Sequence, residues 1–448
     1  MIKVSVIMPS LNVVKYIKPC IDSVVGQTMK EIEILAVDAG STDGTLEMLR
    51  EYERSDERVR VVNSDKRSYG YQMNLGIGMA RGEYVAIVET DDIIEHDMME
   101  YLYGKAKEHE ADMAKGSAWG FFELMNDETY KYLIVPHKRF TYEDAPEEIV
   151  ESPKDKPELF WDDNFIWQGI YRTDFMRGIR FNETPGAAFQ DIGAIFRITS
   201  TANKAVYLKK ELYWYRRTNA EASSYNKKSV NFAAYEYEQM RQYVPEDPAW
   251  EKIYYRKMLG LLLNRFDFMV SEGTYWEESS EGIEKIRGFL KEACESRKFP
   301  FDELINDDAV RLLHLLFDSP RKMFEHDMNK RSRTMSHLRS LHEKGKGRKT
   351  VIFSVGRYGK YVLEYLQIHG YEGIAAYTDN DSSIWGSKVF GIEVLPPEDA
   401  VKRYKGEHFI IANKNNPHEI EDQLCGLGVE RDDISVYNDT LDGFYFNI

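Results

Sequence analysis

Short apolar runs alternate with amphipathic segments in the N-terminal part of the chain. Runs rich in aliphatic and β-branched side chains, which favour strands, lie at residues 3–8, 33–37, 59–62 and 84–88. Helical spacing of apolar side chains predicts helices between them, near residues 14–26, 46–52 and 71–80, and Asn12 is expected to cap the first. This alternation predicts an α/β fold with a doubly wound, mostly parallel sheet and right-handed crossovers.

The strand at 84–88 leads directly into three acids, Glu89, Asp91 and Asp92. Carboxylates this close repel one another and raise one another's pKa. A divalent cation would relieve the repulsion, because Mg²⁺ and Mn²⁺ prefer oxygen ligands and often combine carboxylates with substrate phosphates. The alternative is a solvated turn with helix-capping acids.

Other polar side chains also follow predicted strand ends, at Asn12, Asp38, Asp43 and Asp65. The carboxyl ends of parallel strands lie along one edge of a sheet, where open α/β sheets bind ligands. Each residue alone is also an ordinary loop residue. Their joint placement favours a single ligand-binding crevice.

Composition narrows the class of protein. A chain of 448 residues is too long for one core and suggests two to four domains. The formal charge of -16 argues against a nucleic-acid partner. Three widely spaced cysteines suggest a reducing compartment. The N-terminal residues lack the features of a signal peptide and no apolar run reaches about 18 residues, so we expect a cytoplasmic protein.

Three motifs then carry a family resemblance. They are Val4–Pro9 with Asn12, Val37-Asp38 followed by Gly40–Gly44, and Ala80–Tyr84 leading to Glu89–Asp92. In this order and at these distances they resemble family 2 glycosyltransferases of the GT-A fold. The chain departs from the family at Leu11, Ala39 and Glu89, where an aromatic residue and two aspartates are common.

The resemblance implies a nucleotide-sugar donor and a divalent cation, Mn²⁺ or Mg²⁺. The cation is assigned to Asp92 first, Asp91 second and Glu89 third. Asp38 is expected to contact the nucleoside base. Further donor contacts are expected at Pro9, Asn12, Ser41, Asp43, Lys66, Arg67 and Asp91.

The resemblance also implies that Asp191 is the catalytic base, while Gln190 replaces the acid that the family places before it. The alternative is an acid that stabilises a helix N-terminus. The aromatic run at 165–172 is either a core strand or the wall of an acceptor pocket, contacted by Trp167. Arg216 and Arg217 either bind the donor diphosphate or lie on a surface strand.

Three domains are predicted. Residues 1–225 form the GT-A catalytic domain, although 143–158 is expected to be a loop. Residues 226–345 form a helical segment, and its basic stretch at 321–349 is either a solvated linker or a contact with anionic lipid headgroups at the inner membrane face. Residues 346–448 form a Rossmann-like domain of the nucleotide- or sugar-nucleotide-binding type.

The glycines of this last domain form a weakened fingerprint, with Ser354 in the first slot. A nucleotide site there would use Gly356, Gly359 and Asp379. The alternative is a domain that serves packing.

Together these patterns predict an inverting, metal-dependent transferase. It would move a sugar from a UDP-linked donor to a hydroxyl of a glycan or lipid-linked acceptor, in surface polysaccharide synthesis. A nucleotidyltransferase and a non-catalytic sugar-nucleotide-binding protein are the alternatives. The first is expected to carry a Gly-rich, basic loop after the first strand, which Leu11–Val14 is not.

Overall fold

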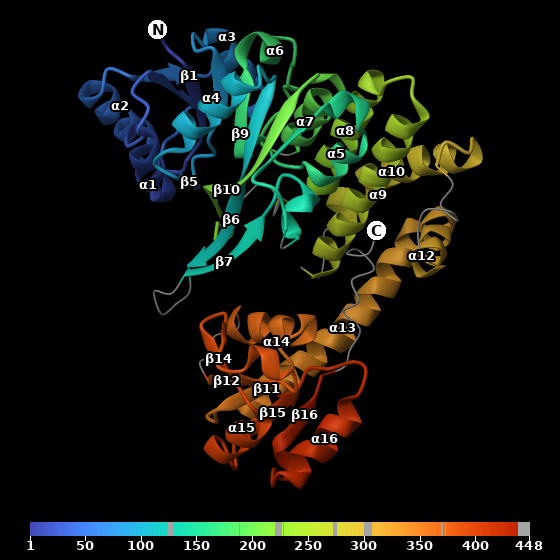
Figure 1. Ribbon diagram of the computed structural model, residues 1–448. Coiled ribbons are helices and arrows are strands. Elements are labelled where there is room, and N and C mark those ends of the chain that lie inside the picture. Colours follow the sequence, from blue (N-terminus) through green and yellow to red (C-terminus); the bar gives the residue numbers. More distant parts are fainter. Residues whose placement is uncertain are drawn as a thin grey trace. The chain divides into compact units, whose positions relative to one another are not determined.

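The computed structural model describes all residues apart from 124–128, 143, 188, 220–225, 227, 272–275, 300–306, 369–370, 372 and 438–448. The chain divides into two compact units (Figure 1). The first comprises Met1–Arg265 and Tyr275–Ile305, and the second comprises Phe266–Thr274 and Asn306–Ile448. Each unit has its own sheet, and each is described by itself.

The first unit is built on a ten-stranded sheet. Its strands are β1 (Val4–Ser10), β2 (Ile32–Asp38), β3 (Val59–Asn63), β4 (Tyr84–Ile87), β5 (Ile93–Ile94), β6 (Met113–Glu123), β7 (Thr129–Ile134), β8 (Glu148–Glu151), β9 (Gly169–Arg172) and β10 (Ala205–Arg216). The order is β3-β2-β1-β4-β9-β6-β10-β5, with β7 paired to β6 and β8 to β10. The pairs β3–β2, β2–β1 and β1–β4 are parallel, whereas β9 is antiparallel to both of its neighbours.

The helices of this unit connect its strands, and further helices follow the last strand, β10. They are α1 (Val14–Val25), α2 (Thr45–Ser55), α3 (Tyr69–Met79), α4 (Met98–Glu108), α5 (Glu158–Asp162), α6 (Thr173–Arg177), α7 (Gln190–Thr201), α8 (Ser229–Met240), α9 (Pro248–Ser271, which continues into the second unit) and α10 (Trp276–Glu295). Every residue of β1, β2 and β4 is buried, which explains their continuous apolar sequence. The predicted α/β fold class is confirmed.

One local prediction is wrong. Residues 143–158 were expected to form a loop, but β8 lies there and pairs antiparallel to β10. In β8 only Ile149 is buried, while Glu148 and Glu151 are partly exposed. An edge strand with one core side chain leaves little hydrophobic pattern in the sequence, so the turn-forming residues around it dominated the prediction.

Besides the end of α9, the described part of the second unit contains two helices, α12 and α13, followed by a smaller α/β domain. Its elements are α12 (Asp307–Asp318), α13 (Pro320–Gly345), β11 (Thr350–Phe353), α14 (Arg357–Ile368), β12 (Ile374–Thr378), β13 (Lys388–Val389), β14 (Ile392–Leu395), α15 (Pro397–Arg403), β15 (His408–Ile411), α16 (Pro417–Gly426) and β16 (Ile434–Val436). The sheet order is β13-β14-β12-β11-β15-β16, parallel except for the β13–β14 pair. From α13, Leu338 and Leu341 pack into the core of this domain.

Several basic side chains at 321–349 are engaged within this unit. Lys344 donates to the carbonyl of Ile434 at 2.8 Å, and Arg348 pairs with Asp433 at 2.7 Å. Contact of this stretch with anionic lipid stays a prediction. Within the described part of the chain, no helix is both long and apolar enough to cross a membrane.

Candidate active site

The loop after β2 is organised by Asp38. This carboxylate is 2% exposed, and its Oδ2 accepts hydrogen bonds from the backbone N–H groups of Gly40 and Ser41, both at 2.9 Å. Its Oδ1 accepts from the Ser41 hydroxyl at 2.5 Å. Gly40 has φ +82°, which a residue with a side chain rarely adopts. Asp38 therefore shapes its own loop, and its contact with a nucleoside base stays a prediction.

The loop after β1 is tied to the loop after β2. Asn12 lies in the left-handed region at φ +54°, and its Oδ1 accepts from the backbone N–H of Thr42 at 2.8 Å. The Asn12 backbone N–H donates to the Ser41 hydroxyl at 2.9 Å. Asp43 accepts from the backbone N–H groups of Val14 and Thr45, each at 3.0 Å. Sequence reasoning placed Asn12 as the cap of α1, and that is wrong: Val13 holds the cap position.

The loop after β3 reaches the same edge. Arg67 donates to the carbonyl of Gly40 at 3.2 Å. The Lys66 ammonium pairs with Glu183 at 2.7 Å and lies 4.6 Å from the ring centre of Tyr71. Pro9, at the end of β1, accepts through its carbonyl from the buried Thr90 hydroxyl at 2.8 Å. The strand-end residues predicted to converge thus belong to neighbouring, interconnected loops.

The three acids after β4 face different partners. Glu89 accepts from the Tyr69 hydroxyl at 2.7 Å. Asp91 is partly exposed and accepts from the Asn219 side chain at 2.7 Å. Asp92 is 1% exposed, and its oxygens accept from the Tyr213 hydroxyl at 2.8 Å and the Arg216 backbone N–H at 2.7 Å. Of the motif's two aspartates, Asp91 is thus the more accessible.

Strand β10 and the residues after it hold this acidic loop in place. The Tyr213 hydroxyl also accepts from the backbone N–H of Glu89 at 3.1 Å. The Arg216 guanidinium donates to the Asp91 carbonyl at 2.8 Å and lies 4.7 Å from the ring centre of Phe121. Arg216 is thus buried against the acidic loop, whereas Arg217 is exposed beside the Tyr215 ring. Sequence reasoning missed Tyr213, because an aromatic residue on a strand is usually a packing residue.

Burial changes the protonation of the acids. Desolvation, reinforced by the charges of Asp91 and Asp191, raises the pKa of Glu89 to about 8 although the Tyr69 hydrogen bond opposes it. Burial and the charge of Asp91 raise the pKa of Asp92 well above its ordinary value. Acids held together in this way are stabilised as carboxylates by a bound cation.

Asp191 lies in the first turn of α7. Desolvation raises its pKa to about 6, while the backbone N–H groups of Asp191 and Ile192 lower it. The residue before it, Gln190, is buried and donates to the carbonyls of Thr184 and Gly186 at 3.1 and 3.2 Å. The charge of Asp191 contributes to the raised pKa of Glu89, and the role of Asp191 as the base stays a prediction.

Trp167 is 4% exposed and lies in an aromatic stack. Its ring packs on Tyr213, Tyr215 and Phe165, with centroid distances of 4.4, 4.9 and 4.8 Å. Trp167 is in a 3₁₀ turn, Ile166–Gln168, that leads into β9. The surroundings are those of a core residue, and contact with an acceptor stays a prediction.

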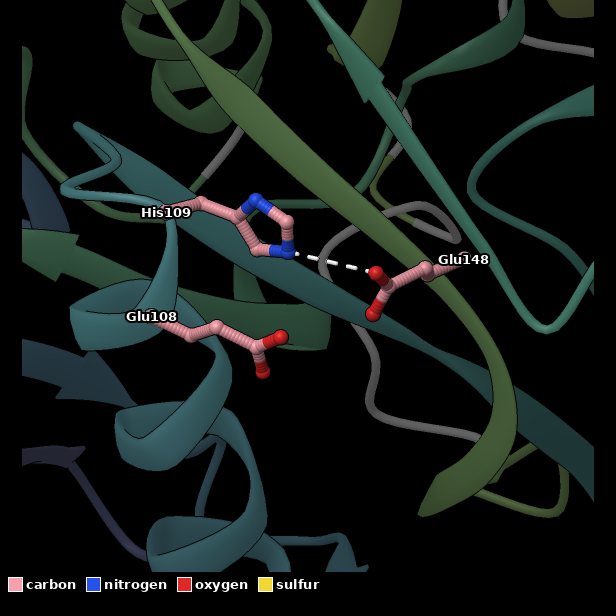
Figure 2. A group of neighbouring side chains, drawn as sticks. All are labelled: Glu108, His109 and Glu148. Atoms are coloured by element: carbon pink, nitrogen blue, oxygen red, sulfur yellow. Dashed lines mark hydrogen bonds and ion pairs between the residues drawn. The ribbon is translucent and has the colours of Figure 1, made fainter.

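A separate group of possible metal ligands lies at the end of α4. Among the residues that the structure describes, Glu108, His109 and Glu148 are the one group of three whose ligand atoms lie within 4.8 Å of one another (Figure 2). Lys105 pairs with Glu108 at 2.9 Å and with Glu148 at 2.7 Å. His109 Nε2 lies 3.2 Å from Glu148. Lys105 pairs with both carboxylates and His109 lies beside one of them, so the group forms an ion-pair network.

The loop after β11 lies at the carboxyl end of that strand, in the sheet of the second unit. Ser354 has φ +91°, and a Cβ on Gly359 would lie 1.9 Å from the Ser354 carbonyl oxygen, so that glycine allows a close approach. Gly356 is exposed. The Asp379 carboxylate accepts from the backbone N–H groups of Val355 at 2.9 Å and Asp381 at 3.0 Å. Nucleotide binding by Gly356, Gly359 and Asp379 stays a prediction.

Comparison with known proteins agrees with this architecture. Among solved structures, S. aureus TarS 1-349 in complex with UDP-GlcNAc aligns with a TM-score of 0.55 and 21% identity, over 73% of this chain and 90% of that chain. The chain therefore has the fold of GT-A glycosyltransferases.

Sequence relatives give the family. The sequence profile of glycosyl transferase family 2 matches residues 5–165. Glycosyltransferase GlyG of Streptococcus pneumoniae is 31% identical over 217 residues, which is 48% of this chain and 70% of that protein. Poly(ribitol-phosphate) beta-glucosyltransferase of Bacillus spizizenii is 35% identical over 122 residues, 26% of this chain and 19% of that protein. The chain belongs to glycosyltransferase family 2 and is a sugar-transferring enzyme.

Proposed function

We propose that the protein is a metal-dependent, inverting glycosyltransferase that moves a sugar from a UDP-linked donor to a hydroxyl of a glycan or lipid-linked acceptor in surface polysaccharide synthesis. The observation that carries the proposal is the acidic loop after β4, whose Asp92 accepts hydrogen bonds from β10. A structural neighbour solved in complex with UDP-GlcNAc supports the donor class, and a relative that is a poly(ribitol-phosphate) beta-glucosyltransferase supports the acceptor class.

The acidic loop fits a divalent cation. Its carboxylates are oxygen ligands of the type that Mn²⁺ and Mg²⁺ prefer, and burial makes their mutual repulsion costly. Asp91 is the proposed direct ligand because it is partly exposed, unlike the buried Asp92, and Glu89, which is also partly exposed, accepts from Tyr69. Asp92 accepts one hydrogen bond on each oxygen, which leaves lone pairs on both, so it is proposed to hold the loop and to contribute to the cation site as well. The ion would neutralise charge on the departing diphosphate.

Asp191 is the proposed general base. A carboxyl with a pKa near 6 is largely ionised at neutral pH and still accepts a proton readily. It takes the proton of the acceptor hydroxyl while the oxygen forms its bond to the anomeric carbon and the bond from that carbon to the diphosphate oxygen breaks. A single displacement of this kind inverts the anomeric configuration. Arg217, exposed beside the acidic loop's supporting strand, is the proposed diphosphate contact.

Three variants test the proposal. The probes are UDP-GlcNAc, UDP-glucose and UDP-galactose, measured by calorimetry with Mn²⁺ and with EDTA, and turnover is followed as released UDP. Asp91→Asn should abolish Mn²⁺-dependent donor binding. Asp191→Asn should bind donor normally and lower turnover by roughly 10²-fold or more. The matched control is Asp97→Asn, because Asp97 follows the motif but pairs with Lys210.

The outcomes separate the alternatives. Donor binding by Asp91→Asn with unchanged Mn²⁺ dependence would place the ion elsewhere. Donor binding by the wild-type protein with no UDP release, even with added saccharide acceptors, would favour a non-catalytic binding protein. Near-normal turnover by Asp191→Asn would remove that residue as the base.

A further inference from the structure

A buried acid outside the sequence motifs lies behind the start of α7. Glu236, on α8, is 2% exposed. Its Oε1 accepts from the Asn182 side chain at 2.8 Å. Its Oε2 has no hydrogen-bond partner among the residues that the structure describes. A buried carboxyl with one oxygen unsatisfied is costly, so its presence calls for an explanation beyond packing.

The first turn of α7 is shaped to receive this carboxyl. A Cβ on Gly193 would lie 1.7 Å from Oε1 of Glu236 and 2.8 Å from its Cδ. Only a glycine therefore lets the carboxyl lie against the helix at this point. Gly193 is two residues after Asp191, so the Glu236 carboxyl lies directly against the turn that carries the proposed base.

We propose that Glu236 is a positioning residue for Asp191, and that the two acids act as a pair at the start of α7. The proposal rests on the function proposed above and adds a residue to that site. Glu236 takes no part in the bond changes: it supports the turn from behind and sets the charge next to the base.

The electrostatics agree with this arrangement. Burial, reinforced by the charge of Asp191, raises the pKa of Glu236 to about 7, while Asn182 and Arg197 lower it. The charges of Asp191 and Arg197, both on α7, act on Glu236, and Asn182, in the segment before that helix, donates a hydrogen bond to it. On the side of α10, Lys285 pairs with Glu238 of α8 at 2.7 Å. At neutral pH Asp191 is thus mostly ionised while Glu236 still holds much of its proton.

Glu236→Gln tests the pairing, because glutamine keeps the volume and an oxygen for Asn182 but cannot ionise. The readout is kcat for UDP release between pH 5 and 9, with a UDP-sugar that the protein binds. In the wild-type protein kcat should rise as Asp191 ionises near pH 6 and again as Glu236 ionises near pH 7, because a second negative charge makes Asp191 a stronger base. Glu236→Gln should lose the second rise and leave KM for the donor within about twofold.

Glu238→Gln is the matched control, since it makes the same change two residues away on α8 and should keep both rises. Thermal unfolding gives a readout independent of activity. When a carboxyl has a higher pKa in the folded protein than its ordinary value, the folded protein loses stability as the pH rises from the ordinary pKa to the folded one. For Glu236 this interval runs from 4.5 to about 7. Glu236→Gln should therefore unfold at a higher temperature than wild type at pH 8, with a smaller difference at pH 5.

These experiments distinguish failure of the Glu236–Asp191 pairing from failure of the proposed function. A Glu236→Gln profile that superimposes on wild type overturns the pairing, even if the shift in unfolding temperature is present, because the role is then structural only. Absence of any UDP-sugar binding or turnover in wild type defeats the proposed function instead. A shift in unfolding temperature that fails to appear at pH 8 shows that Glu236 is not the buried acid described here.

Discussion

Tyr213→Phe should destabilise the first unit and weaken cation binding, although the change removes only one oxygen. The hydroxyl donates to Asp92 at 2.8 Å and accepts from the backbone N–H of Glu89 at 3.1 Å. Phenylalanine keeps the ring that stacks on Trp167, so packing is preserved. The substitution therefore isolates the two hydrogen bonds.

The magnitude follows from these two bonds. A hydrogen bond to an ionised carboxylate contributes about 1.5–3 kcal/mol, and a buried N–H left without a partner costs about 1–3 kcal/mol. Since one hydroxyl serves both groups, we expect a loss of about 3 kcal/mol in the free energy of unfolding. The Tyr213 bond also lowers the pKa of Asp92. Without it that pKa rises further, so Mn²⁺ binding should require a higher pH.

Urea unfolding followed by tryptophan fluorescence measures the first effect, because six of the seven tryptophans lie in the first unit. The control is Tyr237→Phe. Tyr237 is 1% exposed, and within the described part of the chain its hydroxyl has no hydrogen-bond partner, so this variant should be as stable as wild type or slightly more so. Equal stability of the two variants would refute the view that Tyr213 holds the acidic loop.

Two further predictions concern stability. Lys115 and Asp163 form a fully buried ion pair, and Lys115→Met should cost about 3–5 kcal/mol, most of which the double variant with Asp163→Leu should recover in urea unfolding. If the double variant is no more stable than Lys115→Met, the unpaired charge of Asp163 is not the cause of the destabilisation. Ser354→Gly should stabilise the second unit by about 1 kcal/mol in calorimetry, because Ser354 has φ +91°, and a loss of stability would show that its side chain matters more than its backbone strain.

The central strands could be predicted because they are buried on both faces. The run at 84–88 corresponds to β4 and the buried Val88, and the runs at 3–8 and 33–37 correspond to β1 and β2. Continuous burial leaves an unambiguous apolar run in the sequence. The edge strand β8 could not be found in this way, because Ile149 is its one buried side chain.

Features that depend on distant partners were also beyond the sequence. Asn12 looks like a helix cap, yet it takes a left-handed conformation because the loop after β2 offers it two hydrogen bonds. Glu236 belongs to no sequence motif, and its burial follows from the packing of α8 on α7, which the sequence does not indicate. Such contacts join residues that have no fixed spacing along the chain.

The two aspartates of the acidic motif show where sequence reasoning stops. Their spacing places both after β4, but it does not say which way each carboxylate faces. Asp92 turns inward because β10 supplies a hydroxyl and a backbone N–H for its two oxygens, while Asp91 remains partly exposed. Of these partners only Tyr213 depends on side-chain identity, since any residue except proline at 216 would offer the N–H. The direction of Asp92, and with it the proposal that Asp91 binds the cation, thus depends on a residue on another strand.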